Sequence, residues 1–199
     1  MITDTLPKKN IDSKMIHFIL LILFIMLLSV IFVKVKTYRI FGHSMNPTLT
    51  EGEIVLSVKT SKYKRGDIVA LEIEGTTSIK RIIGLPGDKV FIDDDGNVFV
   101  NDQLLEEKYV KEKAKGEIEI PNPYQLKKGE YYILGDNRGD SKDSRLIKVA
   151  CIKEEKIYGK IVFSISKVKK LWVKSKKNYK FSNENLFFIC YNVYMVGCV

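Results

Sequence analysis

The sequence predicts a mainly β protein, with an antiparallel, barrel-like β domain behind one N-terminal transmembrane helix. Two observations favour this fold class. From residue 53 onward, short runs rich in β-branched residues are separated by glycine-containing turns about every 10 residues. Before them lies one long apolar segment without formal charge, residues 16–33. A chain of 199 residues is long enough for one domain and an anchor, but not for two full domains.

The apolar segment from Ile16 to Val33 has the length that a membrane-spanning helix needs, at about 1.5 Å per residue. Basic residues follow it, where a secretory signal would have a small-residue cleavage site. We therefore expect an uncleaved transmembrane anchor over residues 16–33. Three lysines precede the segment, and two lysines and an arginine follow it, so the charge distribution does not fix its orientation.

The remaining elements are predicted from β-rich runs and turn signals. We expect strands over residues 53–58, 67–73, 77–83, 90–92, 98–100, 117–120, 131–134 and 160–165, and one helical turn over 153–156. Glu74-Gly75 is a turn between two of these strands, and the Asp-Asp-Asp-Gly-Asn sequence at 93–97 predicts a hairpin.

The C-terminal extension, residues 167–199, is basic and then apolar. Seven lysines and no acidic residue lie between Lys167 and Lys180, in a chain whose formal net charge is +9. Such a segment suits an anionic membrane surface, with Phe187, Phe188 and Tyr191 dipping inward. The alternative is a disordered, solvated extension.

The few histidines and cysteines limit the chemistry that the chain can perform. Cys151, Cys190 and Cys198 have neither metal-ligand nor redox-motif spacing, so we expect no metal site and read Cys151 as a core residue. His43 directly adjoins Ser44, and neighbouring residues on an extended chain point to opposite faces. His43 is therefore a poor candidate for activating that serine.

Ser44 is the candidate nucleophile. It lies between Gly42 and Pro47, in a constrained turn, and a serine in such a turn is by itself most often a turn residue. A serine hydroxyl needs a neighbouring base, and lysine is an established alternative to histidine. The pKa of a free lysine is about 10.4, so a lysine base has to be buried to lose its proton near neutral pH. Lys80 lies in a predicted strand among isoleucines and suits this role, although a lysine in a strand is commonly a solvated edge residue.

Four motifs resemble the four sequence boxes of the bacterial type I signal peptidases, and they occur in the same order. They are residues 42–49 (GHSMNPTL), 66–69 (GDIV), 80–88 (KRIIGLPGD) and 135–145 (GDNRGDSKDSR). The similarity extends from about residue 38 to 166, which we take as the catalytic β domain. Eukaryotic and archaeal relatives have histidine at the position of Lys80, so the lysine indicates the bacterial branch.

The resemblance implies that Ser44 is the nucleophile and Lys80 the general base, without metal or cofactor. It gives supporting roles to Gly42, Met45, Arg81, Asp136, Ser141, Asp143 and Arg145. Ser141 would hold the lysine amine by a hydrogen bond, and Asp143 and Arg145 would form an ion pair. Some members have a serine at the position of Gly42 whose hydroxyl contributes to the oxyanion hole, and glycine removes that donor.

The function implied is that of a membrane-bound serine endopeptidase, which cleaves signal peptides from exported preproteins after small residues. The chain would be a single-pass protein of the cell membrane, in contact with the lipid bilayer. Residues 1–15 would be cytoplasmic and the catalytic domain extracytoplasmic. We expect a monomer without a nucleic-acid partner.

Two alternatives stay open from the sequence. The self-cleaving repressors share the Ser-Lys pair and a similar β fold, but they have a DNA-binding helical domain where this chain has its apolar segment. A catalytically silent member of the family, acting as a membrane-bound adaptor, is the other.

Overall fold

The computed structural model describes residues 13–165 and 193–197, and the chain divides into two compact units, residues 1–34 and 35–199. The first unit contains helix α1 (Ser13–Lys34), which covers the apolar segment. Within the two described ranges, no helix meets the length and apolarity that crossing a membrane requires. The predicted transmembrane anchor is therefore not confirmed.

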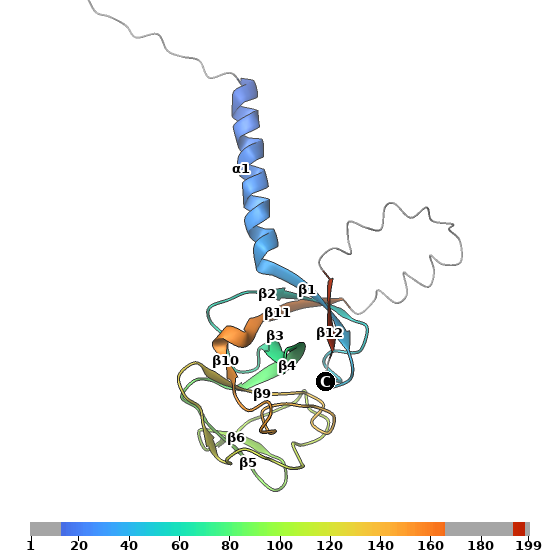
Figure 1. Cartoon of the computed structure of the whole chain (residues 1–199), viewed down its shortest axis with the longest axis vertical. Coiled ribbons are helices and arrows are strands. Elements are labelled where there is room, and N and C mark those ends of the chain that lie inside the picture. Colours follow the sequence, from blue (N-terminus) through green and yellow to red (C-terminus); the bar gives the residue numbers. More distant parts are fainter. Residues whose placement is uncertain (1–12, 166–192, 198–199) are drawn as a thin grey trace, which may run out of the picture. The chain divides into compact units, whose positions relative to one another are not determined.

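The second unit is mainly β and is built from two sheets (Figure 1). Its strands are β1 (Val35–Phe41), β2 (Ile54–Val58), β3 (Ile68–Ile73), β4 (Thr76–Gly84), β5 (Lys89–Ile92), β6 (Val98–Val100), β7 (Gln103–Leu104), β8 (Tyr124–Gln125), β9 (Glu130–Leu134), β10 (Ile152–Lys153), β11 (Ile157–Ile165) and β12 (Val193–Gly197). A single 3₁₀ turn, η1 (Glu154–Lys156), precedes β11.

The larger sheet has eight strands in the order β10-β9-β4-β3-β11-β2-β1-β12, and the smaller has four in the order β7-β6-β5-β8. All pairings are antiparallel except that of β1 with β12. The prediction of antiparallel β structure is thus confirmed. The larger sheet ends at β10 and β12, which have no hydrogen-bonded pairing with each other, so the predicted barrel does not close.

Most predicted strands lie within a few residues of the observed ones, and the hairpins form where their turn residues indicated. Glu74 and Gly75 connect β3 to β4, both with positive φ (47° and 77°), as a two-residue hairpin turn requires. The strand predicted over 117–120 is wrong. The backbone N–H of Glu119 donates to the carbonyl of Arg145, a loop residue, so this segment packs against a loop and does not pair with a strand.

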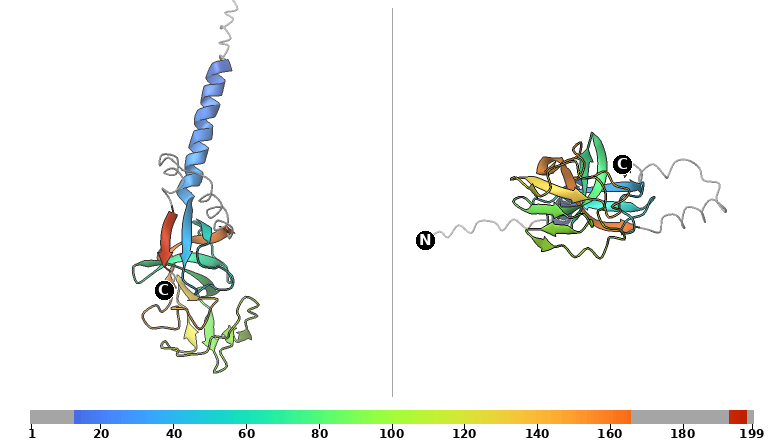
Figure 2. Two further views of the ribbon diagram at one scale, coloured as in Figure 1. Left: turned by 90° about the vertical axis from the view of Figure 1, so that its right-hand side faces the viewer. Right: turned by 90° about the horizontal axis from the view of Figure 1, so that it is seen from below.

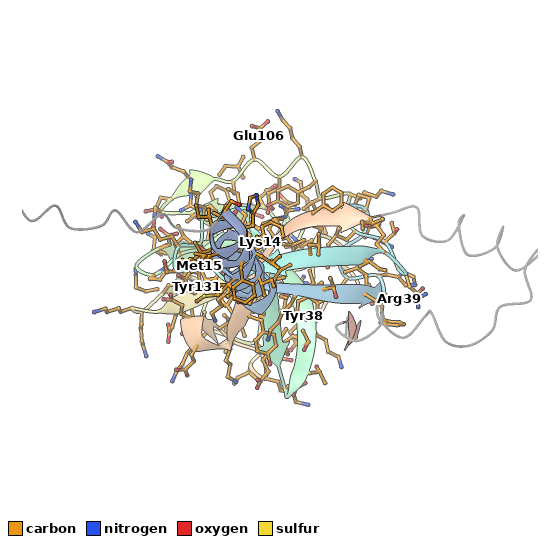
Figure 3. All side chains as sticks on the ribbon, turned by 90° about the horizontal axis from the view of Figure 1, so that it is seen from above. Lys14, Met15, Tyr38, Arg39, Glu106 and Tyr131 are labelled. Carbon is orange, nitrogen blue, oxygen red and sulfur yellow. The ribbon has the colours of Figure 1, made fainter. Side chains whose placement is uncertain are left out.

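Strands β1 and β12 lie side by side at one edge of the larger sheet (Figures 1 and 2). The sequence analysis predicted neither of them. On β1, Tyr38 is buried while the neighbouring Arg39 is exposed (Figure 3). β12 belongs to the C-terminal extension. The membrane placement predicted for Phe187, Phe188 and Tyr191 lies outside the described residues, whereas 193–197 form part of the sheet.

Strand β4 lies between β3 and β9 in the sheet, and its residues from Ser78 to Gly84 are all buried. A lysine on this strand is therefore removed from water. Apolar clusters fill the space around it, and one of them contains Tyr38, Ile40, Met45, Leu49, Val55, Ala70 and Ile79. Cys151 is half-buried beside another cluster, as predicted for a core residue, and burial raises the pKa of its thiol to about 12.

Candidate active site

Ser44 and Lys80 meet in the interior of the β unit. The Nζ atom of Lys80 and the Oγ atom of Ser44 form a hydrogen bond of 2.7 Å. Ser44 is 2% exposed and Lys80 0%. The serine lies in the turn directly after β1, where Gly42 has φ of +81°, a value that favours glycine. The lysine lies on β4, opposite Val69 of β3.

His43 lies away from this pair. Its side chain is 56% exposed, and its ring lies 3.9 Å from the carboxylate of Glu51. Ser44, by contrast, is directed to the interior and hydrogen-bonds the lysine. The basic group in contact with the Ser44 hydroxyl is therefore Lys80, as the sequence analysis predicted.

The loop after β9 holds the backbone of the Ser44 turn. The N–H of Asn137 donates to the carbonyl of Ser44 (2.9 Å), and the side-chain amide of Asn137 donates to the carbonyl of His43 (3.2 Å). Gly135 packs closely in the same place. A Cβ atom there would lie 2.6 Å from the Ser44 carbonyl oxygen and 2.2 Å from Ser141 Oγ, so only glycine allows this approach.

Asp143 and Arg145 form the predicted ion pair, and both are buried. Arg145 donates from Nε to Oδ1 (2.8 Å) and from Nη2 to Oδ2 (3.0 Å) of Asp143. The same carboxylate accepts from the N–H of Gly135, and Arg145 also donates to the carbonyl of Arg138. The pair therefore fixes the loop that supports Ser44 at both of its ends.

Arg81 and Asp136 form a second buried, bidentate pair, with distances of 2.8 Å and 2.6 Å. Thr48 donates its hydroxyl to the same carboxylate, and Arg81 also donates to the carbonyl of Gly66. Burial disfavours the charge on Arg81, but the hydrogen bond and the charge of Asp136 outweigh it and raise the pKa of the guanidinium. Through these contacts the pair connects all four sequence motifs.

Three further residues near the site were not predicted. The guanidinium of Arg81 lies 3.9 Å above the ring of Tyr109, whose hydroxyl donates to Glu107. Glu107 in turn forms an ion pair with the buried Arg138. Burial, with the charge of Glu107, raises the pKa of Tyr109. The segment that contains Glu107 and Tyr109 reads in sequence as a charged loop, and nothing local indicates a partner 31 residues away.

Of the other predicted positions, Met45 is buried as expected, whereas Ser141 lacks its expected hydrogen bond. Met45 is fully buried, in the same apolar cluster as Ile79. The predicted hydrogen bond from Ser141 to the Lys80 amine is not formed: Ser141 Oγ is buried and has no hydrogen-bond partner in the described structure. The hydroxyl instead packs against Gly135, beside the Ser44 carbonyl.

Comparison with known proteins identifies the family of the chain. Residues 13–166 match the family described as "Signal peptidase, peptidase S26". Signal peptidase I U of Bacillus subtilis (strain 168) is 34% identical over 161 residues, which cover 72% of this chain and 82% of that protein. Signal peptidase IB of Staphylococcus aureus (strain MRSA252) is 34% identical over 171 residues, covering 76% and 85%. A crystal structure of a signal peptidase I from Enterococcus faecalis V583 aligns with a TM-score of 0.46 at 29% identity, over 52% of this chain and 100% of that one.

The sequence relatives and the family match define the chain as a serine peptidase, a hydrolase. It belongs to the signal peptidase family, peptidase S26, among the bacterial type I signal peptidases.

Proposed function

We propose that this protein is an endopeptidase that removes signal peptides from exported preproteins, with Ser44 as nucleophile and Lys80 as general base. The observation that carries the proposal is the 2.7 Å hydrogen bond between the two side chains in a buried setting. A hydroxyl and an amine at this distance are placed for direct proton transfer. Desolvation disfavours the ammonium form of a lysine, so burial favours the neutral amine that the reaction needs.

The reaction then proceeds in two stages. Lys80 takes the proton of Ser44 as Oγ bonds to the carbonyl carbon before the scissile bond, and the protonated amine gives that proton to the leaving amino group. Water then attacks the acyl carbonyl carbon as Lys80 takes its proton, the ester bond to Ser44 Oγ breaks, and Lys80 returns the proton to Oγ. The backbone N–H of Ser44 would stabilise the oxyanion. Gly42 has no hydroxyl to add, and one missing donor can cost roughly 3 kcal/mol, so a second donor from backbone or water is expected.

The substrate would bind as an extended strand, with backbone hydrogen bonds giving affinity and small side chains before the cut giving specificity. The position of the nucleophile supports this mode. Ser44 follows the end of β1 by only three residues, so a peptide held along a strand edge there would bring its carbonyl close to Oγ.

Attachment of the enzyme to a membrane is a separate part of the proposal. It is supported by the apolar residues of α1, whose side chains from Met15 to Met26 are exposed, Phe18 to 63%. Apolar side chains exposed over three turns of helix need a partner that shields them from water. Lipid would do so, and fractionation of cells that express the protein would test it.

We propose that Ser141 positions the Lys80 amine during turnover. Its hydroxyl is buried without a hydrogen bond, next to the backbone of the nucleophile. It can therefore form a hydrogen bond with the lysine amine when that amine moves during turnover. For Ser141→Ala we expect kcat to fall by about 10²-fold, the size that a misplaced reacting group can cost. The melting temperature should hardly change, because no hydrogen bond is lost.

Ser144→Ala is the matched control for this test. The Ser144 hydroxyl accepts a hydrogen bond from the N–H of Ile133 (3.0 Å) and is fully buried. Its removal should cost about 1–3 kcal/mol of stability and leave kcat of the folded enzyme nearly unchanged. A Ser141→Ala variant that loses stability but keeps its kcat would contradict the positioning role.

Incubation of the full chain with a preprotein tests the proposed activity. Mass spectrometry should find the mature protein, cut after a small residue. The His43→Ala variant should process the preprotein at the normal rate, because this exposed ring does not contact Ser44. An intact preprotein would refute the function, and an inactive but folded His43→Ala variant would refute Lys80 as the base.

A further inference from the structure

Strand β12, residues Val193–Gly197, lies on the edge of β1 that β2 does not use (Figures 1 and 2). The pairing is parallel and continuous, from Thr37 opposite Val193 to Phe41 opposite Gly197. This strand comes from the C-terminal extension and follows β11 in the chain, but it pairs with β1 and not with β11. The edge of β1 therefore accepts an extended peptide.

The direction and the end of this pairing point to the catalytic site. Because the two strands are parallel, a peptide on this edge runs in the same direction as β1. The register ends at Phe41, and Ser44 is three residues further on. A peptide bound in this way is led toward the nucleophile.

Strand β12 also contacts β4, the strand that contains Lys80. In the described pairings, β9 covers β4 only between Arg81 and Gly84. The preceding part of β4, Thr76–Lys80, pairs with β3 alone. The C-terminal strand thus contacts both of the strands that bring Ser44 and Lys80 together.

We propose that the C-terminal segment is an intramolecular competitor that occupies the peptide-binding edge of β1 and must leave before a preprotein can bind. The inference rests on the proposed function. The segment has the chemistry of an extended peptide ligand: Val-Tyr-Met-Val-Gly is uncharged, rich in strand-forming residues and ends in a small residue. Because it belongs to the same chain, its concentration at the edge is independent of enzyme concentration.

The proposal predicts a specific kinetic effect. An occupied edge reduces the fraction of enzyme that can bind substrate and raises the apparent KM by the inverse of that fraction. Saturating substrate displaces the segment, so kcat is unaffected. Release of the segment should therefore lower KM alone, by about tenfold if the segment is bound nine-tenths of the time.

The test is the double variant Tyr194→Pro/Met195→Pro in the full chain, with Tyr194→Ala/Met195→Ala as the matched control. Two consecutive prolines remove the backbone N–H groups of both residues. One of these two N–H groups points toward β1 in a strand, so the variant loses a hydrogen bond to β1 in either case. We expect a lower KM for a soluble peptide with a cleavage site, an unchanged kcat, and a smaller change in the alanine control. An unchanged or higher KM in the proline variant would overturn the proposal, as would a loss of kcat.

A binding measurement separates this inference from the activity itself. In a Ser44→Ala background, the proline variant should bind the same peptide several-fold more tightly, whether or not the wild-type chain cleaves it. Equal affinity with and without the prolines overturns the inference. An intact preprotein in the wild-type assay overturns the proposed activity.

A disulfide gives the converse experiment. Arg39 and Met195 are register partners, and neighbouring strands are about 4.8 Å apart, within reach of a disulfide. Oxidised Arg39→Cys/Met195→Cys should lose peptide cleavage and regain it on reduction, whereas Arg39→Cys alone should respond to neither treatment. Full activity of the crosslinked enzyme would overturn the proposal.

Discussion

Lys80→Met should abolish preprotein processing, with a fall in kcat of at least about 10³-fold, and Ser44→Ala should do the same. Each change removes one of the two groups joined by the 2.7 Å hydrogen bond. Methionine is similar in length to lysine and apolar, so it should fill the buried site, and the lost hydrogen bond to Ser44 should cost no more than about 1–3 kcal/mol of stability. Kinetics with a preprotein and thermal unfolding of the same samples would measure both effects.

Lys80→Arg is the matched control, because it places a permanent positive charge at this position and cannot supply a neutral base. It should be as inactive as Lys80→Met. An arginine variant that retains substantial activity would show that the charge, and not proton transfer, is what the reaction uses. A Ser44→Ala variant that still releases mature protein would remove the nucleophile from the proposal.

Asp136→Ala should destabilise the protein by about 3–5 kcal/mol, because it leaves the buried guanidinium of Arg81 without its bidentate partner. The hydroxyl of Thr48 loses its acceptor at the same time. Chemical denaturation of the β unit would measure the change. The expected effect is large because the carboxylate is fully buried and two other groups depend on it.

A double-mutant cycle distinguishes this ion pair from simple loss of packing. Arg81→Met with Asp136→Ala should cost clearly less than the sum of the two single changes, since no unpaired charge remains in the double variant. Strict additivity of the two changes would mean that the destabilisation comes from lost side-chain packing and not from the ion pair. The Lys80 and Ser44 variants are read out by kcat and this cycle by stability, so the two experiments report on different parts of the site.

Local sequence patterns predicted the elements whose signals lie within a few residues. The β3–β4 hairpin and the turn at 93–97 were found from their glycine-containing turns, and the buried lysine from the isoleucines around it. The anchor shows the limit of such patterns. The apolar segment predicts a helix, and α1 forms there, but membrane crossing is a further property that the described residues do not confirm.

What escaped prediction depends on distant partners. β1 directly follows the apolar helix and carries charged residues, so its strand character comes from pairing with β2 and β12 and not from its composition. The Glu107–Arg138 pair joins residues 31 positions apart. The sequence does not show which of its charged residues are fully buried, because charged residues are usually solvated. The missing hydrogen bond of Ser141 depends on side-chain geometry that no sequence motif encodes.

The two-residue turn between β3 and β4 has a consequence for catalysis. Lys80 and Arg81 are adjacent on β4, and alternation along a strand directs one to Ser44 and the other to Asp136. A shift of one residue, as an insertion in the turn would cause, would place Ile79 at the nucleophile and Lys80 at the aspartate, so that no base faces Ser44. Glu74 and Gly75 lie in the turn that fixes this alignment. A single inserted residue in that turn would thus inactivate the enzyme with every catalytic residue still present in its sequence.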